Sequence, residues 1–282
     1  GLTFDRLHGR IADWTARGSA LLTAGPRLNF WRAPTDNDHR AAAEWRKAGL
    51  DALQHRVDGT EITRDDDACV QVVLETRVAP PVHAHGFACR YVYRIHGDGS
   101  IHIAVEGTPQ GDLPRLPRIG LQMRLPEMLD QVTWFGRGPG ESYPDSREAG
   151  RVDLFSGEVD DLYTPYVRPQ EHGNHVDTRW VAFTDLRGCG FLVRGLPALQ
   201  FSAMRFTQEN LTEARHTTDL VLTDEITVNL DHRQRGLGSG SCGPDTLPEY
   251  HVQPEAFRFE LVLAPFSADE VEPAALARRL KG

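Results

Sequence analysis

The sequence lacks several features that would place the protein in a specialised class. No apolar run reaches the roughly 18 residues that a membrane span requires, and no Lys- or Arg-rich stretch offsets the net charge of −9. We therefore expect neither a membrane protein nor a general nucleic-acid binder. The chain begins Gly1-Leu2-Thr3, without a methionine, a basic segment or an apolar segment. We expect no signal peptide here and interpret the chain as a fragment or a processed chain.

Cysteine is scarce, and its spacing carries no motif. Four cysteines are scattered through the 282 residues without a CxxC pair, at Cys69, Cys89, Cys189 and Cys242. This spacing is not typical of a disulfide framework. We expect four thiols in a reducing compartment, which predicts a cytoplasmic protein. The remaining composition, with 40% hydrophobic and 25% charged residues, is that of an ordinary globular protein.

Alternation of apolar and polar residues dominates the chain and predicts strands that each lay one face on a core. The apolar members of the clearest runs are Val70, Val72 and Leu74; Phe87, Cys89, Tyr91, Tyr93 and Ile95; Ile101, Ile103 and Val105; Ile226, Val228 and Leu230; and Phe257, Phe259, Leu261 and Leu263. Gly97-Asp98-Gly99 separates two of these runs and predicts a hairpin turn. Many short strands separated by turns predict an all-β antiparallel sandwich, either one large sandwich or two smaller ones.

Helical signals are few. Residues 39–50 (HRAAAEWRKAGL) predict one short helix, and Pro273 predicts the start of a second helix that runs to Leu280. There is no alternation of strand and helix patterns, which excludes a TIM barrel. The sequence contains no internal repeat and no segment typical of a flexible interdomain linker.

Three long turn-rich segments separate strands in the second half of the chain. Residues 136–148, 163–177 and 233–250 are rich in Gly, Pro, Asn and Asp. Loops of this length in a compact domain usually carry function or dock onto another domain. We therefore expect any functional site to involve them.

Acid–base chemistry of the kind that glycosidases perform needs two carboxylates that flank the reacting bond. The loops of this chain supply five candidates: Asp36, Asp38, Glu141, Asp145 and Glu171. No feature of the sequence pairs any two of them. We expect these acids to cap turns, to accept backbone N–H groups or to pair with nearby arginines.

The run Glu171–Asp177 (EHGNHVD) collects residue types that bind metals. The spacing of these residues fits no zinc template, and Gly173-Asn174 suggests a turn. We expect hydrogen bonding within the loop, or a contact with another domain, rather than a metal site.

The Gly-rich segment GLGSGSCG at residues 236–243 contains two serines and Cys242 but lacks the GxSxG pattern of a nucleophile elbow. It also lacks the lysine of a phosphate loop. We interpret it as a flexible turn with close backbone approach. Aromatic side chains next to loops can stack on sugar rings, although packing at the core edge is our expectation for each of Trp31, Trp134, Tyr143, Tyr163 and Tyr166.

Four segments together resemble one family. In chain order they are LNFWRAPTDND (28–38), WFGRGPGESYPD (134–145), YTPYVRPQEHGN (163–174) and LDHRQRGLGSGSCGP (230–244). They are similar to the signature stretches of the C-terminal "small chain" domain of β-galactosidases of glycoside hydrolase family 2. The segment LQFSAMRFTQENLTE (199–213) fits as well. The resemblance covers essentially the whole chain.

The resemblance implies a single domain over residues 1–282, with the large antiparallel supersandwich fold shared with galactose mutarotases. It implies a parent enzyme that hydrolyses terminal β-D-galactosides with retention, through glutamates in a TIM barrel that this chain lacks. No catalytic residue and no cofactor is therefore expected here, since the family commonly holds Mg²⁺ and Na⁺ in other domains. The expected partners are the rest of the enzyme chain and the galactoside, in a parent that is a homo-oligomer.

One loop of this domain reaches the active site in the family, and it usually presents a tryptophan on which the sugar stacks. The matching position here is Cys242. A thiol offers no aromatic face, so the resemblance implies at most a role in lining the substrate pocket. The alternative is that Cys242 is a buried small side chain without a role in the site. The glycines around it predict a mobile loop when the barrel is absent.

Two other functions stay open. The first is a free-standing enzyme of the mutarotase (aldose 1-epimerase) type, which needs a His acid and a Glu base. His172 and Glu171 are available, but neighbours on one strand would point to opposite faces. The second is a sugar-binding or assembly module. Turnover by the chain alone would favour the first, and sugar binding without rescue of a truncated enzyme would favour the second.

Overall fold

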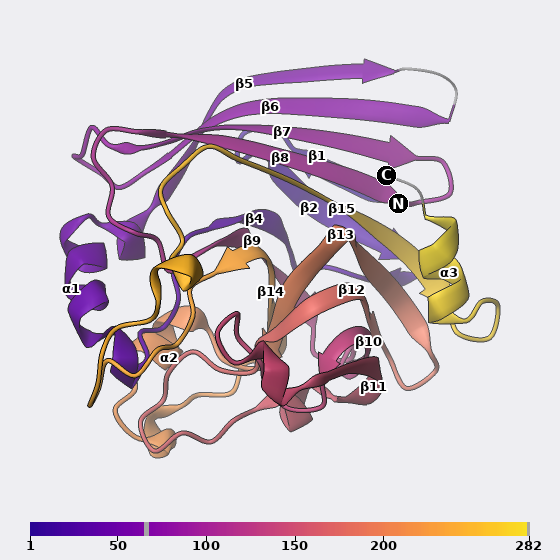
Figure 1. The fold of residues 1–282 in the computed structure, drawn as a ribbon. Helices are drawn as coiled ribbons and strands as arrows, with labels where there is room; N and C mark the ends of the chain where they lie inside the picture. Colours follow the sequence, from indigo (N-terminus) through magenta and orange to yellow (C-terminus); the bar gives the residue numbers. More distant parts are fainter. Residues whose placement is uncertain (65–67, 281–282) are drawn as a thin grey trace.

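The computed structural model describes residues 1–64 and 68–280, and antiparallel strands dominate it (Figure 1). The described strands are β1 (Leu2–Asp5), β2 (Arg10–Ala16), β3 (Ser19–Ala20), β4 (Ala24–Asn29), β5 (Gln54–Arg64), β6 (Cys69–Ala79), β7 (Gly86–His96), β8 (Ile101–Gln110), β9 (Arg118–Pro126), β10 (Gln131–Gly138), β11 (Arg151–Glu158), β12 (His175–Thr184), β13 (Cys189–Met204), β14 (Glu225–Gln234) and β15 (Phe257–Ser267). The described α-helices are α1 (His39–Lys47), α2 (Gln208–Glu213) and α3 (Pro273–Arg279).

Most strands belong to one curved, twelve-stranded sheet. Its main path follows the order β11-β10-β12-β13-β15-β8-β7-β6-β5, and every neighbouring pair is antiparallel. A branch leaves this path at β13, where β14 pairs with β13, β9 with β14, and β4 with β9. Strands β1, β2 and β3 form a separate small sheet. Figure 1 shows β5–β8 as an upper layer with β4, β9 and β14 below it.

The long strand β13 connects the two layers because its halves pair with different strands. Residues 189–196 pair with β15, whereas residues 200–204 pair with β14. The sheet therefore divides at β13 and encloses a core between its branches. The predicted large antiparallel β-sandwich is confirmed.

Aromatic side chains fill the space between the layers. Phe30, which follows β4, stacks on Phe87 of β7 with ring centroids 4.1 Å apart. The backbone N–H of Leu28 on β4 donates to the hydroxyl of Tyr91 on β7 at 3.1 Å. Both contacts fix the branch that carries β4 against the main sheet.

The alternating patterns correctly identify the strands but underestimate how much of them is buried. On β7 the apolar face is buried as predicted, from Phe87 to Tyr93. On β14, however, Thr227 and Asn229 on the second face are also buried. The Asn229 side chain bonds to polar side chains of β4, β9 and β13, and no alternation of residue types reveals this burial.

Both predicted helices form. The first is α1, which ends at Lys47, earlier than predicted, because Gly49 adopts a φ of +69° and turns the chain. The second is α3, which begins at Pro273 as predicted. The short helix α2 was not predicted. The turn at Gly97–Gly99 connects β7 and β8 as expected.

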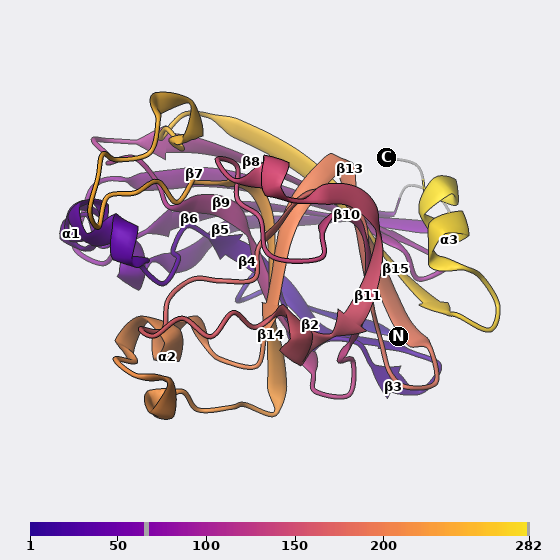
Figure 2. The ribbon, with the colours of Figure 1, turned by 60° about the horizontal axis from the view of Figure 1, so that its bottom comes forward.

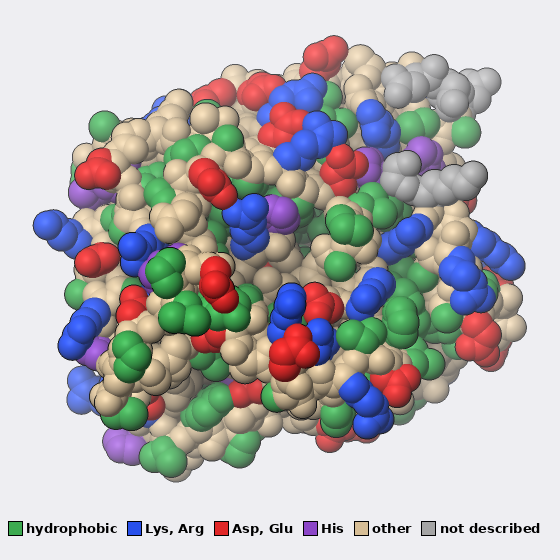
Figure 3. All heavy atoms as spheres, in the orientation of Figure 1, with side chains coloured by type: hydrophobic (Ala, Val, Ile, Leu, Met, Phe, Trp, Pro, Cys, Tyr) green, Lys and Arg blue, Asp and Glu red, His purple; other side chains and the backbone are tan. Residues whose placement is uncertain are grey.

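None of the helices in the described residues is long and apolar enough to span a membrane. Figure 3 shows acidic and basic side chains interspersed over one face of the molecule, without a continuous patch of either sign. Figure 2 shows the loops around α2 and the segment before η6 (Pro248–Tyr250) on the side away from α3. The segment before η6 contributes residues to the candidate site.

Candidate functional site

The four segments that carry the family resemblance lie against one another. We call them the four-loop cluster, which consists of residues 28–38, 134–145, 163–174 and 230–244. The N–H of Glu171 donates to the carbonyl of Ala33 at 3.0 Å, and the N–H of Ser142 donates to the carbonyl of Asn174 at 2.6 Å. The N–H of Leu237 donates to the Asp145 carboxylate at 2.9 Å. Segments that are far apart in the sequence thus form one unit.

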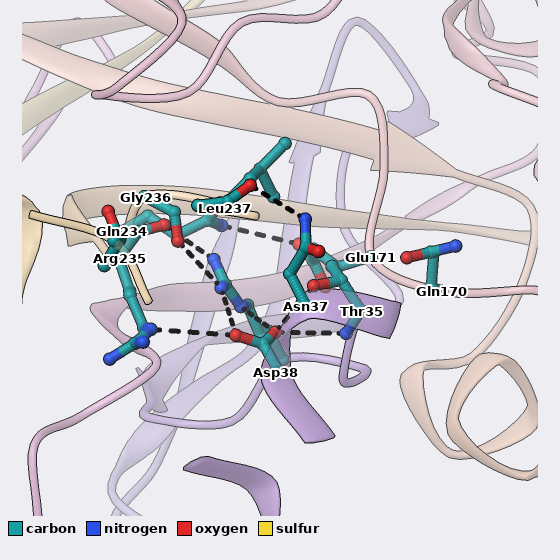
Figure 4. A network of polar contacts seen from close by, with 12 residues as sticks. Thr35, Asn37, Asp38, Gln170, Glu171, Gln234, Arg235, Gly236 and Leu237 are labelled. Atoms are coloured by element: carbon teal, nitrogen blue, oxygen red, sulfur yellow. Dashed lines mark hydrogen bonds and ion pairs between the residues drawn. The ribbon is translucent and has the colours of Figure 1, made fainter. Parts of the chain in front are cut away.

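A fully buried ion pair lies at the centre of the cluster (Figure 4). The Arg32 guanidinium donates to both carboxylate oxygens of Asp38, at 3.0 Å and 2.8 Å, and both side chains are 0% exposed. Asp38 also accepts hydrogen bonds from the N–H and the hydroxyl of Thr35. Bidentate geometry and these extra donors compensate for removing the two charges from water.

The same arginine holds the base of the Gly-rich loop. Arg32 donates from Nη1 to the carbonyl of Arg235 at 2.6 Å and from Nη2 to the carbonyl of Gly236 at 3.1 Å. The side chain of Arg235 lies 3.7 Å from Asp38 and also pairs with Asp245. The ion pair and the loop base therefore depend on each other.

Two further side chains fix the loop beyond its base. Asp145 accepts from the N–H groups of Leu237 and Gly238, at 2.9 Å and 2.7 Å. Asn37 donates to the carbonyl of Gly238 at 2.9 Å and accepts from the N–H of Ser241 at 3.0 Å. The loop therefore runs along a polar track supplied by the other segments.

Glycine is required in this loop by close approach. Gly238 has a φ of +66°, which side-chain-bearing residues rarely adopt. A Cβ atom at Gly240 would lie 2.6 Å from the carbonyl oxygen of Asn37. The predicted close backbone approach is confirmed. The predicted mobility of the loop stays a prediction, and the hydrogen bonds at residues 235–241 anchor its base.

Cys242 lies at this tip and is exposed. Its N–H donates to the carbonyl of Ser239 at 3.1 Å, which closes the turn. Cys242 is therefore not buried within this chain, and its role in a substrate site stays a prediction. Its thiol is presented outward by a loop whose base is anchored in the interior.

The exposure of Cys242 predicts a difference in thiol reactivity. Burial raises the pKa of the Cys89 thiol to about 12, and thiol alkylation requires the thiolate. In the native protein, Cys242 should react with iodoacetamide at least about tenfold faster than Cys89. Mass spectrometry of the alkylated peptides measures both rates. A fast-reacting thiol that persists in Cys242→Ser would contradict this assignment, and in denaturant without reductant all four thiols should react.

The protein contains a second buried ionic group. Arg118 on β9 pairs with Glu171 and lies 3.4 Å from the Asp231 carboxylate on β14, and all three side chains are 0% exposed or nearly so. Gln234 donates to Asp231 at 3.2 Å. Burial raises the pKa of Asp231 to about 7; Arg118 opposes this shift and Glu171 adds to it. The positive charge of Arg118 is thus shared between two carboxyl groups.

Four of the five candidate acids have the structural roles that we expected, and the structure pairs no two of the five as exposed catalytic groups. The fifth, Asp36, differs, since its carboxylate accepts from the side-chain amide of Gln170 at 3.4 Å. Asp38 and Glu171 bind arginines, and Asp145 accepts backbone N–H groups. Glu141 accepts from the N–H of Gly173 at 2.7 Å and from the Tyr166 hydroxyl. The N–H of Asp36 donates to the Gln170 side chain.

The placement of Glu171 and His172 differs from our expectation. They lie in the loop before β12, not on a strand, so the argument from opposite strand faces does not apply. Both are buried, at 1% and 2% exposure. His172 Nδ1 lies 3.0 Å from the carbonyl of Gln170. Neither side chain is accessible to a sugar.

No group of three or more His, Cys, Asp or Glu side chains in the part of the chain that the structure describes is arranged to hold a metal ion. The aromatic candidates are mostly packed: Trp31, Trp134 and Tyr143 are 8%, 3% and 1% exposed. Tyr163 and Tyr166 are partly exposed. Packing at the core edge is confirmed for the three buried rings.

Comparison with known proteins identifies the family of this chain. Residues 1–263 match the family profile described as the beta galactosidase small chain. The chain belongs to this family. It is 33% identical to a β-galactosidase of Priestia megaterium over 259 residues, which are 88% of this chain and 24% of that protein. It is 33% identical to a β-galactosidase of Vibrio cholerae over 276 residues, covering 92% and 26%.

A β-galactosidase of Kluyveromyces lactis is 31% identical over 272 residues, which are 94% of this chain and 26% of that protein. The chain thus spans about a quarter of the length of the curated relatives it matches. Among solved structures, a putative aldose 1-epimerase of Escherichia coli K12 superposes with a TM-score of 0.50 at 10% identity, covering 94% and 95% of the two chains. This similarity confirms the mutarotase-like fold.

Several residues of the site escaped the sequence analysis. Arg32 and Asn37 lie in the same recognised segment as Asp38. Only their contacts in the structure show that they bind the backbone of the Gly-rich loop. Arg118 and Asp231 lie on strands, where a charged residue in an alternating pattern is typical of a solvent-exposed face. Their burial was not detectable without the structure.

Proposed function

We propose that this chain is the C-terminal β-sandwich domain of a β-galactosidase, and that it completes the substrate site without supplying catalytic groups. The enzyme would hydrolyse terminal β-D-galactosides by means of a catalytic barrel outside this chain. The Gly-rich loop, residues 236–243, would form part of the wall of that site, with Cys242 at the substrate side. Residues 1–282 would act as one domain of a larger, homo-oligomeric enzyme.

The main support is the architecture of the four-loop cluster. An exposed loop tip at Cys242 rests on a buried ion pair, Arg32–Asp38, and on the side chains of Asn37 and Asp145. Groups that must be placed precisely against a partner are typically held by such a rigid inner layer. The family membership supports the same conclusion, and so does the fact that the chain spans only about a quarter of the length of its relatives.

The isolated chain should not hydrolyse a chromogenic β-galactoside above the buffer rate. The physical reason is that arginines, backbone N–H groups or Tyr166 already bind four of the candidate acids, which leaves Asp36 without a second free carboxylate to act with. Hydrolysis is measured by release of the chromophore, with an intact β-galactosidase as the positive control. Turnover that disappears on mutation of an acid within this chain would refute the proposal.

Changes at Cys242 should alter substrate binding in the complete enzyme. Cys242→Trp adds an aromatic face at the loop tip and should lower KM for a galactoside by about two- to tenfold, since stacked rings contribute about 0.5–1.5 kcal/mol. Cys242→Ala should change KM only slightly. Steady-state kinetics measure both, and Cys189→Ala, at the far end of β13, is the control. If neither Cys242 variant changes any kinetic parameter while stability is kept, the loop does not reach the substrate.

A mutarotase-type activity has weaker support. The fold is shared, but Glu171 is paired with Arg118, and both Glu171 and His172 are buried. A purified chain that accelerates the interconversion of galactose anomers, followed by polarimetry, would favour this alternative.

A further inference from the structure

A cleft opens between the two layers, and the Gly-rich loop does not contribute to its lining. It has a volume of about 390 Å³ and is lined by residues of β2, β4, β5, β9 and α2. Both ribbon views place β4 between β5 and α2 (Figures 1 and 2). Polar side chains contribute much of the lining, among them Arg10, Arg27, His55, Gln122 and Gln208.

Two arginines in this cleft have no anionic partner. Neither Arg10 nor Arg27 forms an ion pair or a side-chain hydrogen bond within residues 1–64 and 68–280, and the Nε atom of Arg27 is buried without a partner. Burial lowers the pKa of Arg27, and the neighbouring charge of Arg10 lowers it further. Two repelling guanidinium groups in a half-buried position destabilise the fold unless an anion lies between them.

The surroundings of Arg27 add no negative charge inside the cleft. Burial and the charge of Arg27 lower the pKa of His55 to about 3, so this imidazole is neutral at physiological pH. Asn29 and Gln122 form a wall of amides, each donating to the side-chain oxygen of Gln208, at 3.0 Å and 2.9 Å. The interior is therefore polar and basic.

Acidic groups are present only at the rim. Asp51 and Glu209 line the cleft and are exposed, and neither pairs with Arg10 or Arg27. Carboxylates and amide oxygens at such a rim accept hydrogen bonds from hydroxyl groups. The cleft thus offers cations at its base and hydroxyl acceptors at its mouth.

We propose that this cleft binds a small polyhydroxylated anion, either a sugar phosphate or a sugar acid. Arg27 and Arg10 bind its phosphate or carboxylate. Gln122, Asp51 and Glu209 accept hydrogen bonds from its hydroxyl groups. The proposal is independent of the function proposed for the Cys242 loop.

The chemistry of the arginine favours an anion over a neutral sugar. A guanidinium binds the two oxygens of a carboxylate or phosphate in parallel, and partial burial strengthens this interaction. A neutral sugar would instead need an open aromatic face. Trp31 does not offer one, since it is 8% exposed and the guanidinium of Arg46 lies over its ring at 5.7 Å.

Isothermal titration of the chain with four probes tests the proposal. Galactose 6-phosphate and galacturonate should bind, inorganic phosphate should bind more weakly because it lacks hydroxyl contacts at the rim, and galactose should not bind measurably. Added salt should weaken binding of the anions. Equal binding of galactose and galacturonate, or no binding of either anion, would overturn the proposal.

Variants separate binding from folding. Arg27→Gln should weaken anion binding by at least about tenfold, because hydrogen bonds to charged groups are among the stronger ones. Its melting temperature should stay the same or rise, since a repelled charge is removed. Arg40→Gln, an exposed arginine on α1, is the matched control and should bind normally. Arg10→Gln provides a second test should Arg27→Gln not fold.

One outcome would assign the cleft to a protein contact instead. If the anions bind to this chain but not to the enzyme that joins it to its barrel, an acidic side chain of another domain occupies the arginine pair. That result would overturn the proposal of a free ligand. Unchanged binding in Arg27→Gln would overturn it as well.

Discussion

An Asp38→Ala variant should lose about 3–5 kcal/mol of unfolding free energy, because it leaves the Arg32 charge buried without its partner. Both side chains are 0% exposed, so water cannot replace the lost carboxylate. The two hydrogen bonds that Thr35 donates to Asp38 are lost as well. Urea unfolding, followed by circular dichroism, measures the loss.

The matched control is Asp58→Ala. Asp58 pairs with Arg56 at 2.6 Å, but these side chains are 44% and 70% exposed. Exposed pairs contribute about 0–1 kcal/mol, so this variant should be nearly as stable as the wild type. Equal losses in the two variants would show that burial of the Arg32–Asp38 pair has no special weight.

Removing both charges tests whether the ion pair stabilises the fold or positions the Gly-rich loop. An Arg32→Leu/Asp38→Leu double variant should recover much of the stability, since apolar residues of similar volume often replace a buried ion pair without cost. It should not restore the Gly-rich loop, because the carbonyls of Arg235 and Gly236 lose their donor. The alkylation rate of Cys242 should then differ from that of the wild type although the fold is stable.

The strands were predictable because each side chain reports its own environment. On β7 and β8 the alternation separates a core face from an outer face, and the structure confirms both strands and the turn that joins them. The helix at Pro273 was predictable for a similar reason, since proline suits only the first turn of a helix. These are local effects within about ten residues, which a sequence displays directly.

The site was only partly predictable because its contacts are long-range. The recognised segments identified the correct loops, and Asp38 and Asp145 were among the candidate acids. However, Arg32 meets the carbonyl of Arg235 across 203 residues, and Arg118 meets Glu171 across 53. No spacing rule connects such positions. The burial of Asp231 was equally hidden, because it depends on Arg118 of β9, which is distant in the sequence.

Asp231 provides the second prediction with a large effect, a change in stability with pH. Its pKa is about 7 in the folded chain and 3.8 in its ordinary state, so between these values the folded state holds a proton that the unfolded state has released. The stability that this proton confers is fully present below about pH 4 and is lost as the pH rises to about 7. Above that, a charged Asp231 shares Arg118 with Glu171 in the interior.

An Asp231→Asn variant keeps the shape of the protonated acid and cannot ionise. The variant's unfolding free energy, relative to the wild type, should therefore rise by about 2–3 kcal/mol between about pH 5 and about pH 8. Urea unfolding of both proteins at the two pH values measures this difference. Buried histidines such as His175, whose pKa burial lowers to about 4, affect both proteins equally and cancel.

The control for this comparison is Asp224→Asn, which changes an exposed acid just before the same strand. Its difference from the wild type should not vary with pH, because an exposed side chain has nearly the same surroundings in the folded and the unfolded state. A difference that stays constant with pH for Asp231→Asn as well would mean that Asp231 is ionised throughout. In that case the single positive charge of Arg118 would be shared by two carboxylates, and the proton would not be part of this buried group.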